Sequence, residues 1–144
     1  MKVGRSEGGW EVSVLPVELT QRGKEIFQQD TLVRVGSSVS FNVLTGVQSI
    51  HQMHRDVVFE RPEGVEALGG SPRCLVQDMY KKGKFISVQG HPEFHEAIVS
   101  YLVTMRNKQG IFNTAEAEDA LARVGNHHDG IPVAKAFLRF LLED

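Results

Sequence analysis

The sequence predicts an α/β fold, and three observations support this prediction. Segments rich in Val and Ile have strand character along most of the chain up to residue 89. The last third of the chain instead spaces its apolar residues at helical intervals. Hydrophobic residues make up 41% and charged residues 24% of the 144 residues, which is the balance of a globular domain rather than a disordered chain. Strands and helices mixed in this way around one core are typical of α/β proteins.

The strand signals come first along the chain. Residues 10–19 alternate apolar and polar side chains and change phase at Pro16, where proline favours a sheet edge or a bulge. A short helix or turn is expected over 21–27. The remaining strand segments are 50–59, 74–80 and 84–89. The last two flank Lys-Lys-Gly and predict a hairpin.

Three helices are expected in the last third of the chain. The first begins at Pro92, which suits a first helical turn, and its apolar stripe is Phe94, Ile98, Leu102 and Met105. The second begins at Asn113, a good N-cap residue with Glu116 three positions later, and ends at Gly125. Its expected buried face is Ala117, Ala120, Leu121 and Val124. The third covers 131–142, with Asp129 as a solvated N-cap.

One stretch of the chain has no clear pattern. Residues 32–49 mix Val, Ser, Gly and Thr with almost no charge and with no constant period. We expect a loop or an ill-fitting strand there.

Composition excludes several classes of function. The net charge of −2 and the pI of about 6.3 leave no basic stripe for nucleic acid. No apolar run approaches the roughly 20 residues that span a bilayer, and the first residues lack the apolar core of a signal peptide. The single cysteine, Cys74, excludes an internal disulfide. We therefore expect a cytoplasmic protein with no cofactor and with no nucleic-acid or membrane partner.

The segment with the most chemical information is 89–94, which reads Gln-Gly-His-Pro-Glu-Phe. His91 follows a buried-looking strand, and the carboxyl ends of strands are where open α/β sheets place their chemistry. Glu93 is expected in the first helical turn, where the helix dipole favours an ionised carboxylate. An ionised carboxylate beside a histidine fixes one imidazole tautomer, as in the base and orienter of a nucleophilic triad. The pattern therefore indicates a catalytic pair, although an ordinary helix start would give the same residues.

Residues 89–94 resemble the His–Glu motif of class I glutamine amidotransferases. The segments before it resemble, in order, the region after the family's nucleophile helix, its His-x-Asp-x-Val strand and the hairpin that leads into the motif: 8–19, 52–58 and 74–84. The resemblance covers 3–31 and 50–107. It is nearest to the stand-alone fungal amidotransferase-like proteins, which are similar to plant γ-glutamyl peptidases.

This resemblance implies a fold, a reaction and a set of site residues. The fold would be part of a three-layer, flavodoxin-like class I amidotransferase domain. In the family a cysteine thiolate attacks the side-chain amide of glutamine, forms a γ-glutamyl thioester and releases ammonia. His91 would be the general base and then the acid, and Glu93 would orient it. Met53 and His54 would lie near the bound glutamine or γ-glutamyl substrate.

The sequence lacks the family's nucleophile. No Gly-x-Cys-x-Gly elbow is present, and Cys74 has no flanking glycines, so we expect it to be a small core residue. We interpret residues 1–144 as a truncated domain without the N-terminal strands and the elbow, and residues 33–49 as an insertion foreign to the family. The complete family hydrolyses glutamine amide or γ-glutamyl bonds, and we expect this chain to be inactive alone.

Two other functions remain open on the sequence. The chain could be a non-catalytic remnant that serves as an interaction module. It could also be a metal-dependent hydrolase, because His91 and His95 have a spacing that binds zinc on a helix and His51 and His54 could add ligands. A half-domain would leave sheet edges exposed, and we expect such edges to cause self-association.

Overall fold

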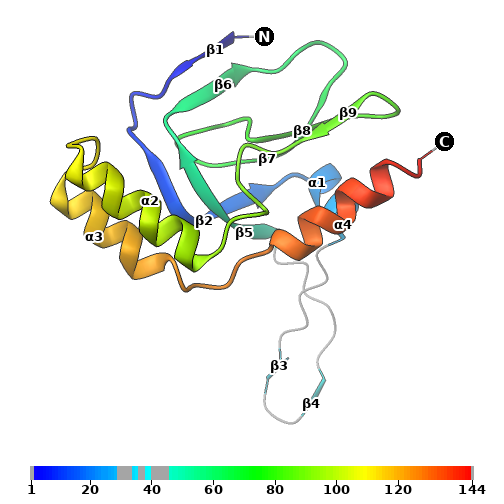
Figure 1. Ribbon diagram of the computed structural model, residues 1–144. Coiled ribbons are helices and arrows are strands. Elements are labelled where there is room, and N and C mark those ends of the chain that lie inside the picture. Colours follow the sequence, from blue (N-terminus) through cyan, green and yellow to red (C-terminus); the bar gives the residue numbers. More distant parts are fainter. Residues whose placement is uncertain (1, 29–33, 36–37, 40–45, 144) are drawn as a thin grey trace.

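A computed structural model of the protein describes residues 2–28, 34–35, 38–39 and 46–143. The strands and the short helix α1 lie before residue 88, and the helices α2 to α4 follow (Figure 1). The strands are β1 (Lys2–Arg5), β2 (Glu11–Leu19), β3 (Arg34–Val35), β4 (Ser38–Val39), β5 (Val47–His54), β6 (Asp56–Glu60), β7 (Glu66–Gly70), β8 (Asp78–Lys81) and β9 (Phe85–Ser87). The helices are α1 (Gln21–Phe27), α2 (Glu96–Lys108), α3 (Thr114–Arg123) and α4 (Gly130–Phe140). The predicted α/β class is therefore confirmed.

The main sheet has five strands in the order β5-β2-β7-β8-β9, and it curls as Figure 1 shows. β1 pairs with β6, and β3 pairs with β4. The flavodoxin-like arrangement that the resemblance implies depends on parallel strands, but every pairing between the strands that the structure describes is antiparallel. The described part of the fold is therefore a curled antiparallel sheet with helices, and the flavodoxin-like arrangement stays a prediction.

The ladder between β2 and β5 forms the centre of this sheet. It pairs Glu11 with His54 at one end and Glu18 with Val47 at the other. β7 reaches β2 only at Glu18 and Leu19, so Pro16 has a strand partner on one side alone. The sheet edge that the sequence predicted at Pro16 is confirmed, because a proline without an N–H costs nothing where no strand pairs.

Several predicted elements are confirmed with altered boundaries. The helix expected over 21–27 is α1, and the expected hairpin is β8 and β9, which are shorter than predicted. The segment 50–59 is two strands rather than one, because the chain turns at Arg55 and β6 leaves to pair with β1.

The unpatterned stretch 33–49 falls largely outside the described residues, which exclude 33, 36–37 and 40–45. Its last residues, Val47 to Ser49, belong to β5, so a loop or an ill-fitting strand was the wrong prediction there. Gln48 is fully buried and pairs with Val17, which shows that cross-strand pairing decided this segment without an apolar pattern. The interpretation of 33–49 as an insertion stays a prediction.

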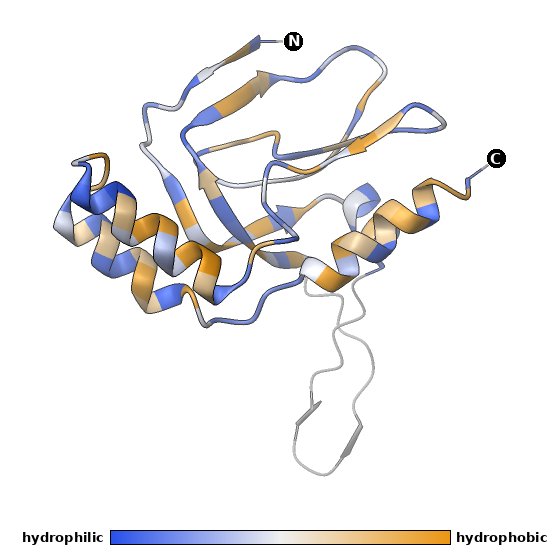
Figure 2. Cartoon of the chain, viewed as in Figure 1, coloured by the Kyte–Doolittle hydropathy of each residue, from blue (hydrophilic) through white to orange (hydrophobic). Residues whose placement is uncertain are grey.

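Two apolar cores lie on opposite faces of the β2–β5 ladder. Met53 and Ile50 are three residues apart in β5, so their side chains point to opposite faces. Met53 contacts α2 and α3 in a core made of Val12, Met53, Val99, Val103, Phe112, Ala117, Ala120 and Val124. Ile50 contacts α1 and α4 in a core made of Val17, Leu19, Phe27, Ile50, Leu68, Tyr80, Val133 and Ala136. Figure 2 shows α4 as largely apolar along its length.

The helices correct two details of the predicted core. In α2 the fully buried residues are Val99 and Val103, because the helix begins at Glu96. Phe94 and Leu102 of the predicted stripe pack partly buried against the same core. In α3 the capping box of Asn113 and Glu116 is confirmed. Leu121 was wrongly assigned to the buried face, since it is 38% exposed.

In the loop before α4, Asp129 is the N-cap residue, as predicted, but it is not a solvated cap, because its side chain is only 14% exposed. Asp129 makes no side-chain bond to its own helix. Its carboxylate instead accepts the main-chain N–H of Ser49 at 2.7 Å, and its own N–H donates to the Ser49 oxygen at 2.7 Å. Asp129 therefore acts as a strand-like partner for the outer edge of β5.

We expect Gly23→Ala to destabilise the protein strongly. A Cβ at Gly23 would lie 1.9 Å from the main-chain oxygen of Leu68, so α1 would have to move away from β7. Overpacking of this kind lowers the free energy of unfolding by about 2–3 kcal/mol, which urea denaturation followed by circular dichroism would measure. The matched control is Gly125→Ala, whose Cβ would meet no atom closer than 3.6 Å. Equal midpoints for the two variants would contradict this packing.

Candidate functional site

His91 lies in a turn between β9 and α2. The turn is closed by the N–H of Phe94, which donates to the His91 oxygen at 3.2 Å, and α2 begins only at Glu96. Glu93 is therefore outside the first helical turn, and the predicted effect of the helix dipole on it is wrong. The physical reason is that the main-chain N–H of His91 donates to the His51 oxygen at 2.8 Å, so bonding to β5 takes precedence over an earlier helix start.

His91 and Glu93 form a hydrogen-bonded pair. His91 Nδ1 lies 2.9 Å from Glu93 Oε1, and the side chains are 34% and 62% exposed. The imidazole stacks on the Phe94 ring with centroids 4.0 Å apart and planes 6° from parallel. A carboxylate can only accept, so Nδ1 carries the proton of the neutral ring. Nε2, for which the described residues offer no hydrogen-bond partner, is then the free basic nitrogen.

The Glu93 carboxyl is held in its ionised form. Partial burial opposes ionisation, but the hydrogen bond from His91, the Glu93 main-chain N–H and the imidazoles of His91 and His128 outweigh it. The pKa of Glu93 therefore lies below its ordinary value. An ionised carboxylate is what an orienting residue needs in order to fix the histidine tautomer.

His51 is the residue through which β5 meets this turn. Burial first, and then the nearby His128, His95 and His91, lower the pKa of His51 to about 4, so its ring is neutral at ordinary pH. Its Nδ1 has no hydrogen-bond partner in the described part of the chain. His51 therefore contributes through its main-chain groups and not as a charge.

Met53 and His54 were predicted to lie near the substrate. Met53 is 8% exposed and packs among the residues of α2 and α3. His54 is 9% exposed, and its Nε2 lies 3.1 Å from Gln52 Oε1 and 3.4 Å from Glu11 Oε2. Burial lowers the pKa of His54, and the Glu11 charge opposes that shift. Contact of these two residues with a substrate stays a prediction.

A buried polar network surrounds Glu11, and sequence reasoning missed it. The Glu11 carboxylate accepts Ser71 Oγ at 2.7 Å and Gln77 Nε2 at 2.9 Å, and Gln77 Oε1 accepts Gln52 Nε2 at 2.8 Å. Glu11 is only 4% exposed. Glu11 alternates with the apolar Trp10, Val12 and Val14, and the face of β2 that carries Glu11 is buried as well. A signal for this network was present in the sequence, because the polar Gln48, Gln52 and His54 lie at alternate positions of β5 and so share one face.

The network meets the site at Gly90. A Cβ at Gly90 would lie 2.9 Å from Ile50 Cγ2 and 3.1 Å from Gln52 Nε2. Only glycine therefore lets the main chain pass this close to β5 just before His91.

Cys74 is a buried residue of the β7–β8 connection. It is 1% exposed, and its thiol donates to the Val76 oxygen at 3.5 Å. Burial raises the pKa of the Cys74 thiol, which disfavours the reactive thiolate. The prediction that Cys74 is a small core residue is confirmed.

The histidines that suggested zinc do not gather into one site. Among residues 2–28, 34–35, 38–39 and 46–143, no group of three or more His, Cys, Asp or Glu side chains could hold a metal ion. His51 and His128 do approach each other, with ring centroids 4.7 Å apart, but both belong to the support of the His91 turn.

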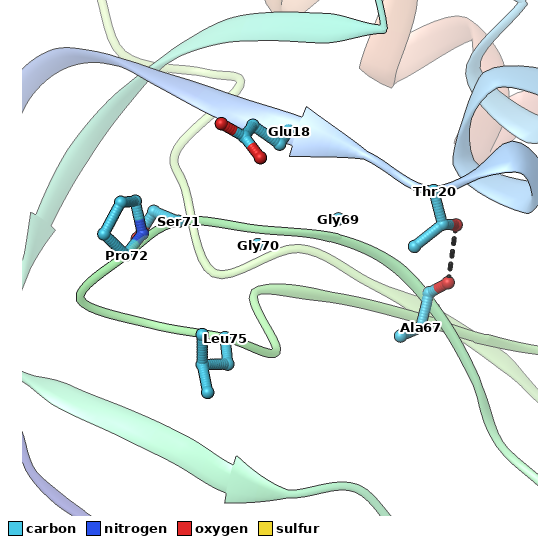
Figure 3. A pocket seen from close by; sticks show the side chains of 8 residues that line it. All are labelled: Glu18, Thr20, Ala67, Gly69, Gly70, Ser71, Pro72 and Leu75. Atoms are coloured by element: carbon cyan, nitrogen blue, oxygen red, sulfur yellow. Dashed lines mark hydrogen bonds between the residues drawn. The ribbon is translucent and has the colours of Figure 1, made fainter.

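The described residues also form hollows elsewhere on the surface. Figure 3 shows one beside the end of β2, where Thr20 Oγ1 donates to the Ala67 oxygen at 2.8 Å. Its lining residues are Glu18, Thr20, Ala67, Gly69, Gly70, Ser71, Pro72 and Leu75. Neither His91 nor Glu93 lines it, so the pair lies on an open face rather than in this pocket.

The comparisons with known proteins agree with the motif. A glutamine amidotransferase-like protein of Schizosaccharomyces pombe is 33% identical over 135 residues, which are 94% of this chain and 48% of that protein. Gamma-glutamyl peptidase 2 of Arabidopsis thaliana is 35% identical over 60 residues, which are 42% of this chain and 24% of the peptidase. The crystal structure of a glutamine amidotransferase from Thermotoga maritima matches with a TM-score of 0.68 at 15% identity, over 97% of this chain and 54% of that one. No family model matches the chain.

The chain is therefore similar in sequence to glutamine amidotransferase-like proteins, as the resemblance predicted, and its fold matches that of a solved glutamine amidotransferase. It spans about half the length of the S. pombe relative. None of the helices that the structure describes is long and apolar enough to cross a membrane.

We expect the tautomer of His91 to depend on Glu93. In Glu93→Gln a neutral amide replaces the charged acceptor, and charge-assisted hydrogen bonds are about twice as strong as neutral ones. The share of the Nε2–H tautomer should therefore rise several-fold, which long-range proton–nitrogen NMR at mildly alkaline pH would measure. Glu96→Gln, at the start of α2, is the matched control and should leave the tautomer unchanged. If the share of the Nε2–H tautomer in Glu93→Gln equals that of the native protein, the geometry of the pair is contradicted.

A second prediction concerns Asp78, which lies behind the segment that leads to His91. Burial raises the pKa of Asp78 to about 7, and the Gln89 N–H opposes this shift. The folded state holds a proton that the unfolded state releases near pH 4, so this group's contribution to stability is lost as the pH rises from about 4 to about 7. Asp78→Asn removes the titration. Its stability relative to the native protein should therefore increase by up to about 4 kcal/mol over that range and then level off. Urea denaturation at a series of pH values would measure the difference, and parallel curves would contradict the prediction.

Proposed function

We propose that His91 and Glu93 are the general base and the orienting carboxylate of a site that hydrolyses glutamine amide or γ-glutamyl bonds. The observation that carries this proposal is the 2.9 Å contact between His91 Nδ1 and Glu93 Oε1. That contact leaves Nε2 without a partner in the described part of the chain. The names of the relatives, a glutamine amidotransferase-like protein and a γ-glutamyl peptidase, support this choice of substrate.

The pair can carry out two proton transfers in this reaction. His91 Nε2 takes the proton of an attacking thiol, whose sulfur forms a bond to the amide carbon. The imidazolium then gives that proton to the leaving nitrogen as the carbon–nitrogen bond breaks, which releases ammonia and leaves a thioester. Water hydrolyses the thioester with His91 again acting as the base. Glu93 stabilises the imidazolium throughout.

The nucleophile in this proposal comes from outside these 144 residues. Cys74 is buried, has a raised pKa and bonds to the Val76 oxygen, so it is unsuited to attack. The chain alone is therefore inactive. The missing strands and elbow would complete the three-layer family fold around His91, with Met53 and His54 on the substrate side.

Association with further protein is part of the same proposal. Ile131 and Leu138 on α4 are 70% and 62% exposed, and exposed apolar side chains of this size favour contact with another surface. Among the described strands, β9 is one of the two edges of the five-stranded sheet, and such edges favour strand pairing. These features support self-association of the isolated chain.

An ammonia-release assay tests the proposal. With glutamine, the 144-residue chain should release no more ammonia than its His91→Ala variant, and with a γ-glutamyl dipeptide no more free amino acid, because loss of a triad nucleophile costs about 10⁶-fold in rate. A longer form that carries a Gly-x-Cys-x-Gly segment should be active. Its activity should fall by about a thousandfold or more in His91→Ala.

Two controls make the assay specific. Cys74→Ser and His127→Ala should leave the longer form active, because the first residue is buried in the core and the second is exposed. Ammonia release by the 144-residue chain that Cys74→Ser abolishes would overturn the proposal. A longer form without activity would favour the non-catalytic interaction module.

A further inference from the structure

His128 bridges β5 and the turn that carries His91. Its Nδ1 lies 3.3 Å from the main-chain nitrogen of His51, and its Nε2 lies 3.2 Å from the main-chain oxygen of Pro92. The side chain comes from the loop between α3 and α4, so it joins three segments that are far apart in sequence. Neither the motif nor the resemblance assigns a role to this residue.

The two contacts define one form of the ring. The His51 nitrogen is a donor, so Nδ1 must present its lone pair, and the Pro92 oxygen is an acceptor, so Nε2 must carry the proton. His128 therefore binds as a neutral imidazole with its proton on Nε2. Only this form makes both hydrogen bonds at once.

These bonds restrain the main chain on both sides of His91. The His91 N–H donates to the His51 oxygen at 2.8 Å, and the Pro92 oxygen, held by His128, belongs to the peptide that leads into Glu93. The relative placement of His91 and Glu93 depends on the two peptides between them. Fixing one end by β5 and the other by His128 therefore limits the rotation that would separate Nδ1 from the carboxylate.

The contact also depends on the small size of Gly130. A Cβ there would lie 2.3 Å from the Pro92 oxygen and 2.7 Å from His128 Nε2. Any larger residue would push the oxygen away from the imidazole. The bond between the α3–α4 loop and β5 does not need His128, because Asp129 holds Ser49 through two separate bonds.

We propose that His128 is a positioning residue for the His91–Glu93 pair, acting through the hydrogen bond from its Nε2 to the Pro92 oxygen. An effect of His128 on catalysis rests on the proposed function, but its effect on the geometry of the His91–Glu93 pair does not. The bond holds the Pro92–Glu93 peptide in the orientation that brings the carboxylate to His91 Nδ1.

Two nearly isosteric variants separate the two bonds of His128. His128→Asn keeps an acceptor near the Nδ1 position and loses the donor to Pro92, whereas His128→Gln keeps a donor near the Nε2 position and loses the acceptor. The readouts are the tautomer of His91 by proton–nitrogen NMR and hydrogen exchange at the His91 N–H. His127→Ala, at the 80% exposed neighbour, is the matched control.

In His128→Asn we expect the Nε2–H tautomer share of His91 and the exchange rate of its N–H each to rise about fivefold, as for loss of one hydrogen bond. His128→Gln should restore both values to near those of the native protein, and His127→Ala should leave them unchanged. Exchange at Val103, in the core, reports whether a variant is generally loosened. If His128→Asn does not fold, Gly130→Ala tests the same bond by displacing the oxygen.

A native His91 tautomer in folded His128→Asn, or no recovery in His128→Gln, would overturn the inference. Neither readout requires catalysis. A failed ammonia assay would therefore contradict the proposed function and leave the positioning role of His128 intact.

Discussion

Among the described strands none pairs with the outer edge of β5, and the way its polar groups are satisfied determines where the His91 turn lies. Asp129 bonds both main-chain groups of Ser49, His128 accepts the His51 N–H, and the His91 N–H donates to the His51 oxygen. An unpaired main-chain group in a partly buried place costs free energy, so each of these contacts stabilises the fold. The same contacts bring the α3–α4 loop and the His91 turn together at one edge of the sheet.

The opposite edge of the ladder is closed by different means. β7 covers only the end of β2, and Arg123 of α3 donates to the main-chain oxygens of Val12 and Val14 at 2.9 Å each. The buried Glu11 carboxylate meets its hydrogen-bonding need with Ser71 and Gln77. A buried carboxylate is tolerated only when donors surround it, so this corner behind Gly90 is rigid. The rigidity on that side complements the bonds that β5 makes to the His91 turn.

The residues proposed for the chemistry are therefore distinct from the residues that hold them in place. His91 and Glu93, the proposed base and orienter, lie on an open face, and hydrogen bonds from β5 and from His128 support the turn that carries them. The chain spans about half the length of the S. pombe protein that it resembles. The proposed catalytic pair is thus formed within a chain that matches only about half of this relative.

The sequence by itself determined the α/β class, the family and the His91–Glu93 motif, because local patterns and a short motif carry that information. It also determined the capping box at Asn113, since a cap depends on residues three positions apart. Only the tertiary structure decided that α2 begins at Glu96, that Glu11 is buried and that His128 and Asp129 support the site. These features depend on hydrogen bonds between residues 36 to 80 positions apart, such as His128 with Pro92 and Asp129 with Ser49. No local pattern encodes such contacts, because the unpaired edge of β5 that requires them exists only once the sheet has formed.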